Sequence, residues 1–239
     1  KGEHWIYKNA DAIIFTKEGD VDYIKEKKWD IDQGGEIDLG KCHYINNGVD
    51  LESFDKSVVE YPLEDQDLEA DKFNVIYTGA IRPVNNVGNI LDTAKLLRNE
   101  IDIQFLIYGA GNQEDELRKR IVEEDLFNVK FKGRVEKSHI PYILSKSSVN
   151  LLNYSQTQYN WTRGNSSNKL FEYMASGKPI ISTVKMGYCI LDKYGCGISL
   201  DENTPEDLAK AILYVKNMPE EQYETMGTNG RRGAEDFDF

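Results

Sequence analysis

The hydrophobic residues of this chain form short runs, and amphipathic segments separate these runs. The runs are rich in β-branched and aromatic residues, which favours buried strands, and they occupy 73–79, 103–109, 129–133, 149–154, 178–183 and 197–200. Segments with the apolar spacing of a helix occupy 87–97, 114–124, 140–145, 188–194 and 205–217, and a further helix opens near Asn168. Strict alternation of strand and helix predicts an α/β fold, a doubly wound parallel sheet with helices on both faces.

The first part of the chain has a different pattern. Residues 5–29 indicate a helix, a strand and a second helix, and a strand over 44–50 leads into an Asn-Gly turn. An acidic, irregular stretch at 55–72 separates this part from the main run of strands. We therefore predict that residues 1–43 are the tail of a preceding domain and that 44–239 form the doubly wound domain. Because the chain does not begin with Met and stops abruptly, we expect a fragment truncated at its C-terminus.

The charge and composition narrow the class of protein. The chain carries 41 acidic and 29 basic residues, and its net charge of −12 argues against a nucleic-acid partner, which needs a concentrated cationic face. No apolar run approaches the ~18 residues of a membrane span, and no signal peptide is visible. The three cysteines lie far apart without a CxxC pair, and the three histidines are too scattered to suggest a metal cluster. These features predict a cytoplasmic protein without a metal.

The acidic residues are unevenly distributed along the chain. The 55 residues between Glu136 and Asp192 contain a single acid, Glu172, although the chain average of 41 in 239 predicts about nine. Residues 73–91 are also free of acids. Both windows contain the carboxyl ends of predicted strands, which is where open parallel sheets bind ligands. We infer a site for an anionic ligand at this edge of the sheet.

Glycines follow three of the predicted strands at the same edge. They are Gly79, Gly109, Gly111 and Gly133. Such residues permit a tight turn or the close approach of a ligand. The Gly-Ala-Gly run at 109–111 is not a complete GxGxxG motif and does not open the domain, so an ordinary turn explains each glycine, taken singly, equally well.

The segment SSNKLFEYMASGKPII places a cation at an unusual position. Ser167 or Asn168 can cap its helix, and Lys169 then stands in the first turn, where the helix dipole disfavours a cation. A bound diphosphate would make Lys169 favourable beside the free backbone N–H groups, and Glu172 would accept both hydroxyls of a ribose. The alternative is that Asn168, Glu172 and Ser176 form the polar stripe of an ordinary surface helix.

The run NKLFEYMASGKPII resembles the donor-binding motif of glycosyltransferase family 4, whose members are retaining enzymes with the GT-B fold. Further segments resemble other motifs of that family, in the family's order: NNGVD, YTGAIRPVNN, LIYGAGNQEDELR and NVKFKGRV. The resemblance covers nearly all of residues 44–235. It implies that 44–239 is the Rossmann-like, nucleotide-sugar donor-binding half of a GT-B fold. It also implies that 1–43 is the remnant of an N-terminal acceptor domain that is otherwise missing.

The resemblance assigns residues to the parts of a nucleotide-sugar donor. The diphosphate is implied to lie at Lys169 and at the backbone amides from Asn168 to Leu170. Glu172 matches the glutamate that binds the ribose. The residues implied to approach the donor and its base are Gly79, Gly109, Gly111, Arg134 and Val135.

Three positions depart from the family's pattern. The first glutamate of its E-x7-E motif would fall at Gly164, and the arginine and lysine usual in the first loop would fall at Ala80 and Asn85. Arg82 is then the best candidate to replace the missing charge. Arg82 and Lys169 are therefore the predicted catalytic residues, which would stabilise the charge on the departing diphosphate.

Together these assignments predict a retaining glycosyltransferase that moves a sugar from a UDP-, GDP- or ADP-sugar to a hydroxyl acceptor, in the synthesis of surface polysaccharides or other glycans. The resemblance implies no metal and no cofactor, and the fragment alone is expected to be inactive. Acceptors in the family are often lipid-linked, so peripheral attachment to the inner face of the membrane stays open. The sequence does not identify the sugar, the base, the acceptor or the oligomeric state.

Alternatives stay open for the function and for single residues. A nucleotide-sugar 2-epimerase of the same fold and a non-catalytic, nucleotide-binding partner subunit both fit the motifs. A dehydrogenase-like dinucleotide binder is disfavoured, because no GxGxxG opens a βαβ unit with an acid ~20 residues later. Tyr154, Tyr159 and Trp161 would stack on a sugar or base, with interior packing as the alternative role.

Overall fold

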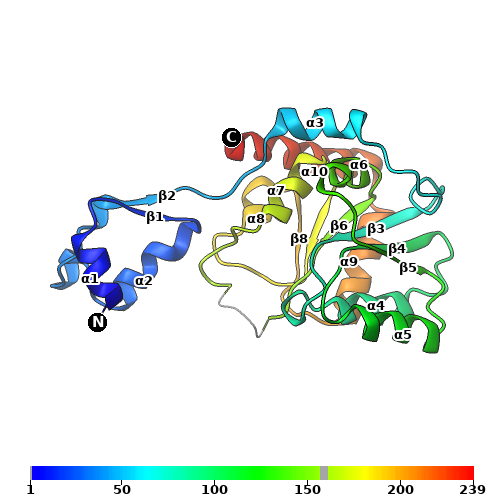
Figure 1. Cartoon of the computed structure of the whole chain (residues 1–239), viewed down its shortest axis with the longest axis horizontal. Coiled ribbons are helices and arrows are strands. Elements are labelled where there is room, and N and C mark those ends of the chain that lie inside the picture. Colours follow the sequence, from blue (N-terminus) through cyan, green and yellow to red (C-terminus); the bar gives the residue numbers. More distant parts are fainter. Residues whose placement is uncertain (1, 157–160) are drawn as a thin grey trace.

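The computed structural model describes residues 2–156 and 161–239, and its largest part is a parallel sheet covered by helices (Figure 1). Six strands of the described chain form this sheet, in the order β5-β4-β3-β6-β7-β8, and every neighbouring pair is parallel. They are β3 (Phe73–Thr78), β4 (Ile103–Tyr108), β5 (Val129–Gly133), β6 (Val149–Leu152), β7 (Ile180–Ser182) and β8 (Gly197–Ser199). The predicted doubly wound parallel sheet is confirmed.

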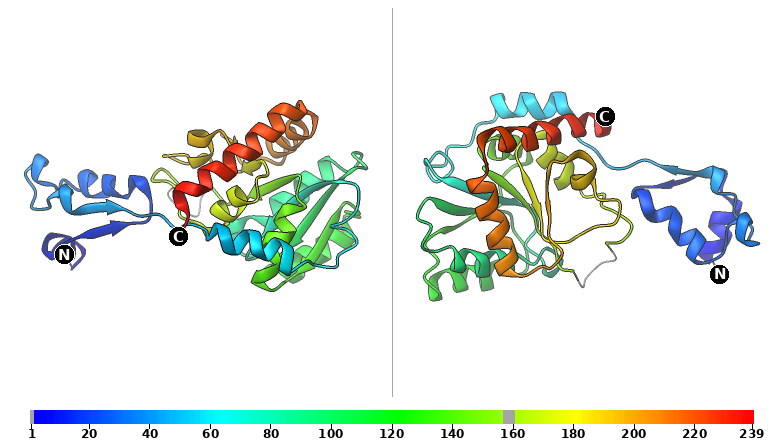
Figure 2. Two further views of the ribbon diagram at one scale, coloured as in Figure 1. Left: turned by 90° about the horizontal axis from the view of Figure 1, so that it is seen from above. Right: turned by 180° about the vertical axis from the view of Figure 1, so that it is seen from behind.

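Helices cover both faces of the sheet (Figures 1 and 2). One face carries α4 (Val87–Leu96), α5 (Glu114–Glu123) and α9 (Pro205–Asn217). The opposite face carries α3 (Leu51–Glu60), α6 (Ile140–Ser145), α7 (Asn168–Ala175), α8 (Ile190–Tyr194) and α10 (Glu220–Ala234). No helix in the described part of the chain combines the length and the apolar composition needed to cross a membrane.

The central strands are buried on both sides. In β3, Val75 and Tyr77 belong to the core beneath α4, α5 and α9, whereas Ile76 belongs to the core beneath α3, α6 and α7. Because neither face meets solvent, apolar side chains occur in both sets of alternating positions, beside buried polar residues such as Asn74 and Thr78. This explains why the sequence shows continuous hydrophobic runs instead of an alternation of apolar and polar residues.

Two predictions for the segment before the sheet need correction. The strand expected over 44–50 ends at Tyr44, because the following Asn-Asn-Gly segment leaves the small sheet, and β2 is Cys42–Tyr44. The stretch expected to be irregular from residue 55 begins instead with α3, whose N-cap Asp50 accepts a hydrogen bond from the Ser53 amide at 2.7 Å. This cap satisfies an otherwise free N–H of the first turn, which stabilises a helix despite its acidic composition.

The helix α10 was not predicted from the sequence. Gly227, Gly230 and Gly233 are buried within it, and glycine has a low helix propensity, so the helical pattern is weak in the sequence. The glycines are needed for close packing: a side chain at Gly227 would collide with the carbonyl of Gly177 just after α7. Tertiary contact therefore overrides local propensity in this helix.

Residues 2–44 form a small part of the molecule that lies beside the sheet (Figures 1 and 2). Its elements are α1 (Gly2–Asn9), β1 (Ile13–Phe15), α2 (Val21–Glu26) and β2, and β1 pairs with β2 in parallel. The predicted order of helix, strand and helix is confirmed. Ile13, Ile24 and Ile37 form a core separate from that of the sheet. That this part belongs to an acceptor domain stays a prediction.

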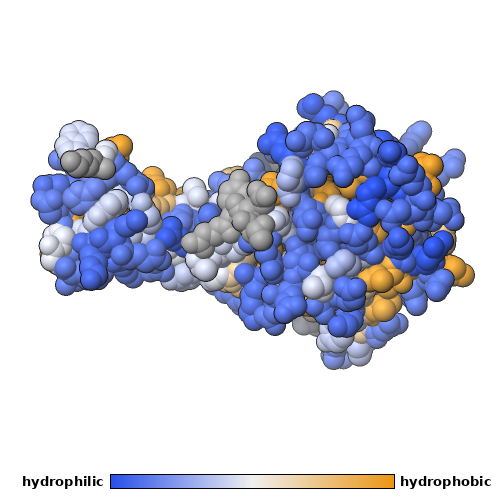
Figure 3. Space-filling view, turned by 90° about the horizontal axis from the view of Figure 1, so that it is seen from below, coloured by the Kyte–Doolittle hydropathy of each residue, from blue (hydrophilic) through white to orange (hydrophobic). Residues whose placement is uncertain are grey.

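Polar contacts join this small part to the loop before α7 and to the segment before α8. Arg163 pairs with Glu26 at 2.7 Å, and the Tyr188 hydroxyl donates to Asp22 at 2.6 Å. The surface seen from below is largely hydrophilic on both parts (Figure 3). The two parts are therefore linked by the extended chain after β2 and by exposed polar contacts, while each keeps its own apolar core.

Candidate functional site

The loops after β3 and β4 pass very close to each other at the carboxyl edge of the sheet. Gly79 has a φ of +145°, a conformation that residues with side chains avoid, and a Cβ placed there would lie 3.1 Å from Lys169 Nζ. A Cβ at Gly109 would collide with the Gly79 carbonyl. Gly109 therefore allows the two loops to pass each other, and Gly79 leaves room for the Lys169 side chain.

Lys169 lies in the first turn of α7, after the N-cap Ser167. Its Nζ is 4.7 Å from the ring centroid of Tyr77 and 4.9 Å from that of Tyr154. The same atom is 3.4 Å from both the Tyr77 hydroxyl and Asn85 Oδ1. All of these partners are neutral. Burial lowers the pKa of Lys169 to about 7, although the charge of Glu172 acts in the opposite direction.

The opening of α7 also presents backbone N–H groups. The Ser167 N–H donates to Asn165 Oδ1 at 2.9 Å, and the Leu170 N–H donates to the Ser167 carbonyl at 3.0 Å. Within the described residues, the N–H groups of Asn168 and Lys169 have no such partner. They lie at the positive end of the helix dipole and are available to an anion.

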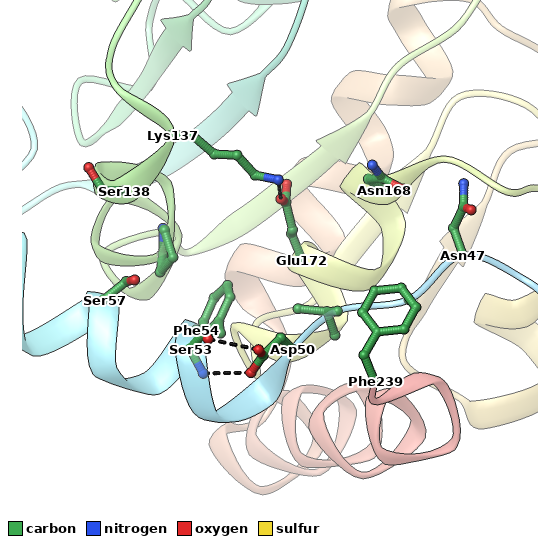
Figure 4. Close-up of a pocket in the computed structure, with 13 residues that line it drawn as sticks. Asn47, Asp50, Ser53, Phe54, Ser57, Lys137, Ser138, Asn168, Glu172 and Phe239 are labelled. Atoms are coloured by element: carbon green, nitrogen blue, oxygen red, sulfur yellow. Dashed lines mark hydrogen bonds and ion pairs between the residues drawn. The ribbon is translucent and has the colours of Figure 1, made fainter.

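Glu172 follows Lys169 by three residues and lines the same hollow. Burial raises the pKa of its carboxyl, and the charges of Lys137 and Lys169 oppose that shift. Lys137 Nζ lies 4.0 Å from Glu172 Oε1, and the two side chains reach toward each other from the turn before α6 and from α7 (Figure 4). A carboxylate of this kind can accept hydrogen bonds from two hydroxyl groups.

Three adjoining hollows form one cleft along this edge. The central hollow, of about 570 Å³, is lined by Lys169 and Glu172. The linker hollow, of about 610 Å³, lies between the chain that enters α3, the start of α6 and α7 (Figure 4). The outer hollow, of about 450 Å³, is bounded by Gly79 and Arg134. Lys137 lines all three hollows, which makes it the residue common to the whole cleft.

Most of the predicted donor-binding residues meet in this cleft. Those that line it are Gly79, Gly109, Arg134, Val135, Asn168, Lys169 and Glu172. Leu170 is buried in the core beneath α7, and Gly111 is exposed beside the backbone of Ile81, beyond the outer hollow. Arg82 is exposed and lines none of the three hollows. The role of Arg82 stays a prediction from the sequence.

Other residues of the cleft were not singled out in the sequence. Asn47 Nδ2 donates to the Ser166 carbonyl at 2.6 Å, and Asn46 Nδ2 donates to the Asn165 carbonyl at 3.0 Å. These bonds tie the chain entering α3 to the loop that leads into α7. The Asn-Asn-Gly sequence was an available signal, as a turn and as part of a segment that resembles a family motif, but neither assigned these residues to the site. Lys137 lies in an ordinary charged segment that gave no signal.

The structure shows the surroundings of the three positions that depart from the family's pattern, Gly164, Ala80 and Asn85. Gly164 is buried with a φ of +104°, so a glutamate there would be strained, and its surroundings include Tyr188. Asn85 Nδ2 donates to the Ala80 carbonyl at 2.7 Å, while its Oδ1 faces Lys169 at 3.4 Å. Thus Asn85, held by the backbone at residue 80, helps to position Lys169.

The aromatic residues of the loop before α7 have different environments. The rings of Tyr154 and Trp161 pack with centroids 4.7 Å apart, and Trp161 Nε1 donates to the Ser155 carbonyl at 3.0 Å. Tyr154 is 6% exposed and also lines the central hollow. Tyr159 lies outside the described residues. Packing therefore accounts for Trp161, whereas Tyr154 both packs and faces the cleft.

A parallel α/β sheet with a charged cleft at its carboxyl edge defines the class of protein: the chain has the Rossmann-like fold found in GT-B glycosyltransferases. Residues 63–233 match the family model described as Glycosyl transferases group 1, and the chain belongs to this family. A comparison with curated proteins finds no match.

Solved structures share this fold at low sequence identity. Anabaena Alr3699/HepE, crystallised with UDP and glucose, is 17% identical with a TM-score of 0.72, over 98% of this chain and 60% of its own. Sucrose-phosphate synthase from Thermosynechococcus elongatus is 21% identical with a TM-score of 0.73, over 99% and 56%. A glycosyltransferase from Rickettsia africae is 14% identical with a TM-score of 0.71, over 100% and 63%. The chain therefore spans about three fifths of the length of these proteins.

Proposed function

We propose that this chain is the donor-binding part of a retaining glycosyltransferase of family 4, which transfers a sugar from a nucleotide diphosphate sugar to a hydroxyl acceptor. The observation that carries the proposal is the Lys169 ammonium, which is held by neutral groups beside two free N–H groups at the opening of α7. A cation without an ion-pair partner is unfavourable at the opening of a helix, where the helix dipole is positive. A bound anion would make the same cation favourable.

The diphosphate would lie against the opening of α7. The N–H groups of Asn168 and Lys169 would donate to its oxygens, and the Lys169 ammonium would neutralise part of its charge. As the bond to the sugar breaks, negative charge accumulates on the departing diphosphate, and these fixed donors would stabilise it. Arg82, on the exposed loop after β3, would add a further charge from the rim of the cleft.

The nucleoside would occupy the outer hollow and its border with the central one. Glu172 would accept the two ribose hydroxyls, and the segment of Arg134 and Val135 would face the base. Solved complexes of Anabaena HepE contain UDP or UDP-glucose, and those of S. aureus TarM and pneumococcal GtfA contain UDP. Uracil is therefore the first base to test, ahead of guanine and adenine.

The remaining parts of the proposal concern the setting of the reaction. The acceptor would be a hydroxyl group of a growing surface polysaccharide or other glycan, bound with the help of an acceptor domain. The reaction would take place in the cytoplasm, at the inner face of the membrane where the acceptor is lipid-linked. No metal or cofactor is assigned to the chemistry, because the fixed cation and amides would supply the charge stabilisation.

Calorimetric titration of the chain with UDP, GDP and ADP tests the proposal directly. We expect one nucleoside diphosphate to bind, with the matching monophosphate binding more weakly because it lacks one of the two phosphates. Absence of binding by all three would overturn the donor-binding role. For the reaction, release of UDP from UDP-glucose that depends on an added acceptor domain and acceptor indicates transfer. Conversion of the donor to an epimer without any acceptor would instead indicate a 2-epimerase.

A further inference from the structure

The central hollow carries little positive charge for the ligand that it is proposed to hold. The charged residues that line it are Lys137, Lys169 and Glu172, which gives two cations and one carboxylate. Burial lowers the pKa of Lys169 to about 7, so Lys169 alone is only partly charged near neutrality when the site is free. A diphosphate with its multiple negative charges therefore calls for a second cation in the same hollow.

Lys137 is placed to be that cation. It starts the turn Lys137–His139 before α6, and its side chain extends across the cleft toward Glu172 (Figure 4). The side chain is 85% exposed, and its Nζ is 4.0 Å from Glu172 Oε1. A long contact of this kind on an exposed lysine is weak, so the ammonium is free to change partners within the cleft.

The other nearby cations are less well placed. Arg82 lines none of the three hollows, and Arg134 lines the outer hollow alone. Lys137 borders the central hollow together with Gly79, Asn168 and Lys169, which are the groups proposed to surround the diphosphate. Besides Lys169, it is thus the cation that lines the hollow at the opening of α7.

We propose that Lys137 is a second diphosphate-binding residue, which rests on Glu172 in the free protein and contacts the diphosphate when a ribose takes its place on that carboxylate. This inference depends on the proposed donor-binding function. In the free protein the Lys137 ammonium lies against the Glu172 carboxylate that is proposed to bind the ribose. In the complex the ribose hydroxyls engage Glu172, and the released ammonium neutralises a phosphate oxygen that Lys169 does not reach.

The test compares UDP with uridine, which lacks the phosphates. Calorimetric titrations would use the wild-type chain, Lys137→Ala, Lys137→Arg and the control Lys119→Ala. Lys119 is matched to Lys137 because it is also exposed (73%) and also pairs with a glutamate, Glu123, at 3.5 Å, but it lies on α5. Far-UV circular dichroism and thermal melts of each variant would confirm that the fold is retained.

We expect Lys137→Ala to weaken UDP binding about tenfold, which corresponds to about 1.4 kcal/mol. Uridine binding should stay within twofold of wild type, because the contact that is lost is a charge-assisted hydrogen bond to phosphate. Lys137→Arg should retain most of the UDP affinity, and Lys119→Ala should be unchanged. Unchanged UDP binding by Lys137→Ala, or equal losses for UDP and uridine, would overturn the second-cation role alone. If the wild-type chain binds none of the nucleoside diphosphates, the proposed function fails and this inference fails with it.

Discussion

Lys169 lies over the ring of Tyr77: its Nζ is 4.7 Å from the ring centroid and 3.4 Å from the hydroxyl of that tyrosine. Tyr77 is fully buried in β3, and its hydroxyl donates to the Ala80 carbonyl at 2.9 Å, so the ring has a fixed orientation. The face of an aromatic ring attracts a cation without neutralising it. This arrangement therefore places the Lys169 amine at the opening of α7 without a carboxylate ion-pair partner among the described residues, and keeps it available to an anionic ligand.

Replacement of this lysine should move ligand affinity and protein stability in opposite directions. Lys169→Met keeps the length of the side chain and removes a desolvated charge. We expect UDP affinity to fall at least tenfold, since charge-assisted hydrogen bonds contribute about 1.5–3 kcal/mol. The free energy of unfolding at pH 7 should rise by about 1 kcal/mol, because a poorly compensated charge has been removed. Titration calorimetry and urea denaturation measure the two quantities.

The control for this variant is Lys119→Met, which removes a lysine from the exposed surface of α5. Surface substitutions of this kind change stability by less than about 0.5 kcal/mol, and UDP affinity should not change. A Lys169→Met protein that loses stability together with affinity would show that the ammonium supports the fold itself. In that case the interpretation of Lys169 as a charge reserved for a ligand would be wrong.

The affinity for UDP should depend on pH through Lys169. Burial lowers the pKa of Lys169 to about 7 in the free protein, and a bound diphosphate favours the protonated ammonium and so raises that pKa. Binding must then take up a proton above pH 7. The affinity should be highest near pH 7 and fall from pH 7 to pH 9, by up to about tenfold per pH unit. Calorimetry in two buffers of different ionisation enthalpy would measure the proton uptake, and Lys169→Met should remove it.

The parallel sheet was predictable because its central strands are buried on both faces, which places apolar residues on both sides of each of these strands. Sequence patterns did not predict the elements whose structure depends on tertiary contacts. In α10, Gly227 and Gly233 lower the local helix propensity, yet they let the helix lie against α7 and α8. In α3, the acidic composition predicted an irregular segment, but the hydrogen bond from the Ser53 amide to the N-cap Asp50 stabilises a helix. The local sequence pattern of a segment does not show such contacts.

The candidate site was predictable where charge and helix geometry act within a few residues. The position of Lys169 and Glu172 on one helix follows from their spacing and from the scarcity of other acids around them. The contact between Lys137 and Glu172 could not be predicted, because it joins the turn before α6 to α7 and so depends on the fold. The location of Arg82 outside the hollows likewise depends on the path of the loop after β3, which spacing does not determine.

A side chain at Gly79 should interfere with Lys169. A Cβ at this position would be 3.1 Å from Lys169 Nζ, and the φ of +145° is strained for any residue other than glycine. We expect Gly79→Ala to reduce the free energy of unfolding by about 1–3 kcal/mol and to weaken UDP binding. Gly164→Ala is the matched control, because φ there is +104° but the nearest contact of a Cβ is an ordinary 3.6 Å. It should lose stability and keep its affinity for UDP, and equal losses of affinity in both variants would contradict a local effect on Lys169.

The proposed role of Glu172 can be separated from every other effect by changing the ligand. Glu172→Ala should weaken UDP binding at least tenfold, because hydrogen bonds from hydroxyls to a carboxylate contribute about 1.5–3 kcal/mol. UDP that lacks both ribose hydroxyls should bind the wild-type chain as weakly as UDP binds Glu172→Ala. The variant should then bind UDP and its dideoxy analogue equally well, since no carboxylate remains to distinguish them. If Glu172→Ala weakens the dideoxy analogue as strongly as it weakens UDP, the carboxylate acts elsewhere, for example by holding Lys137, and the ribose assignment is wrong.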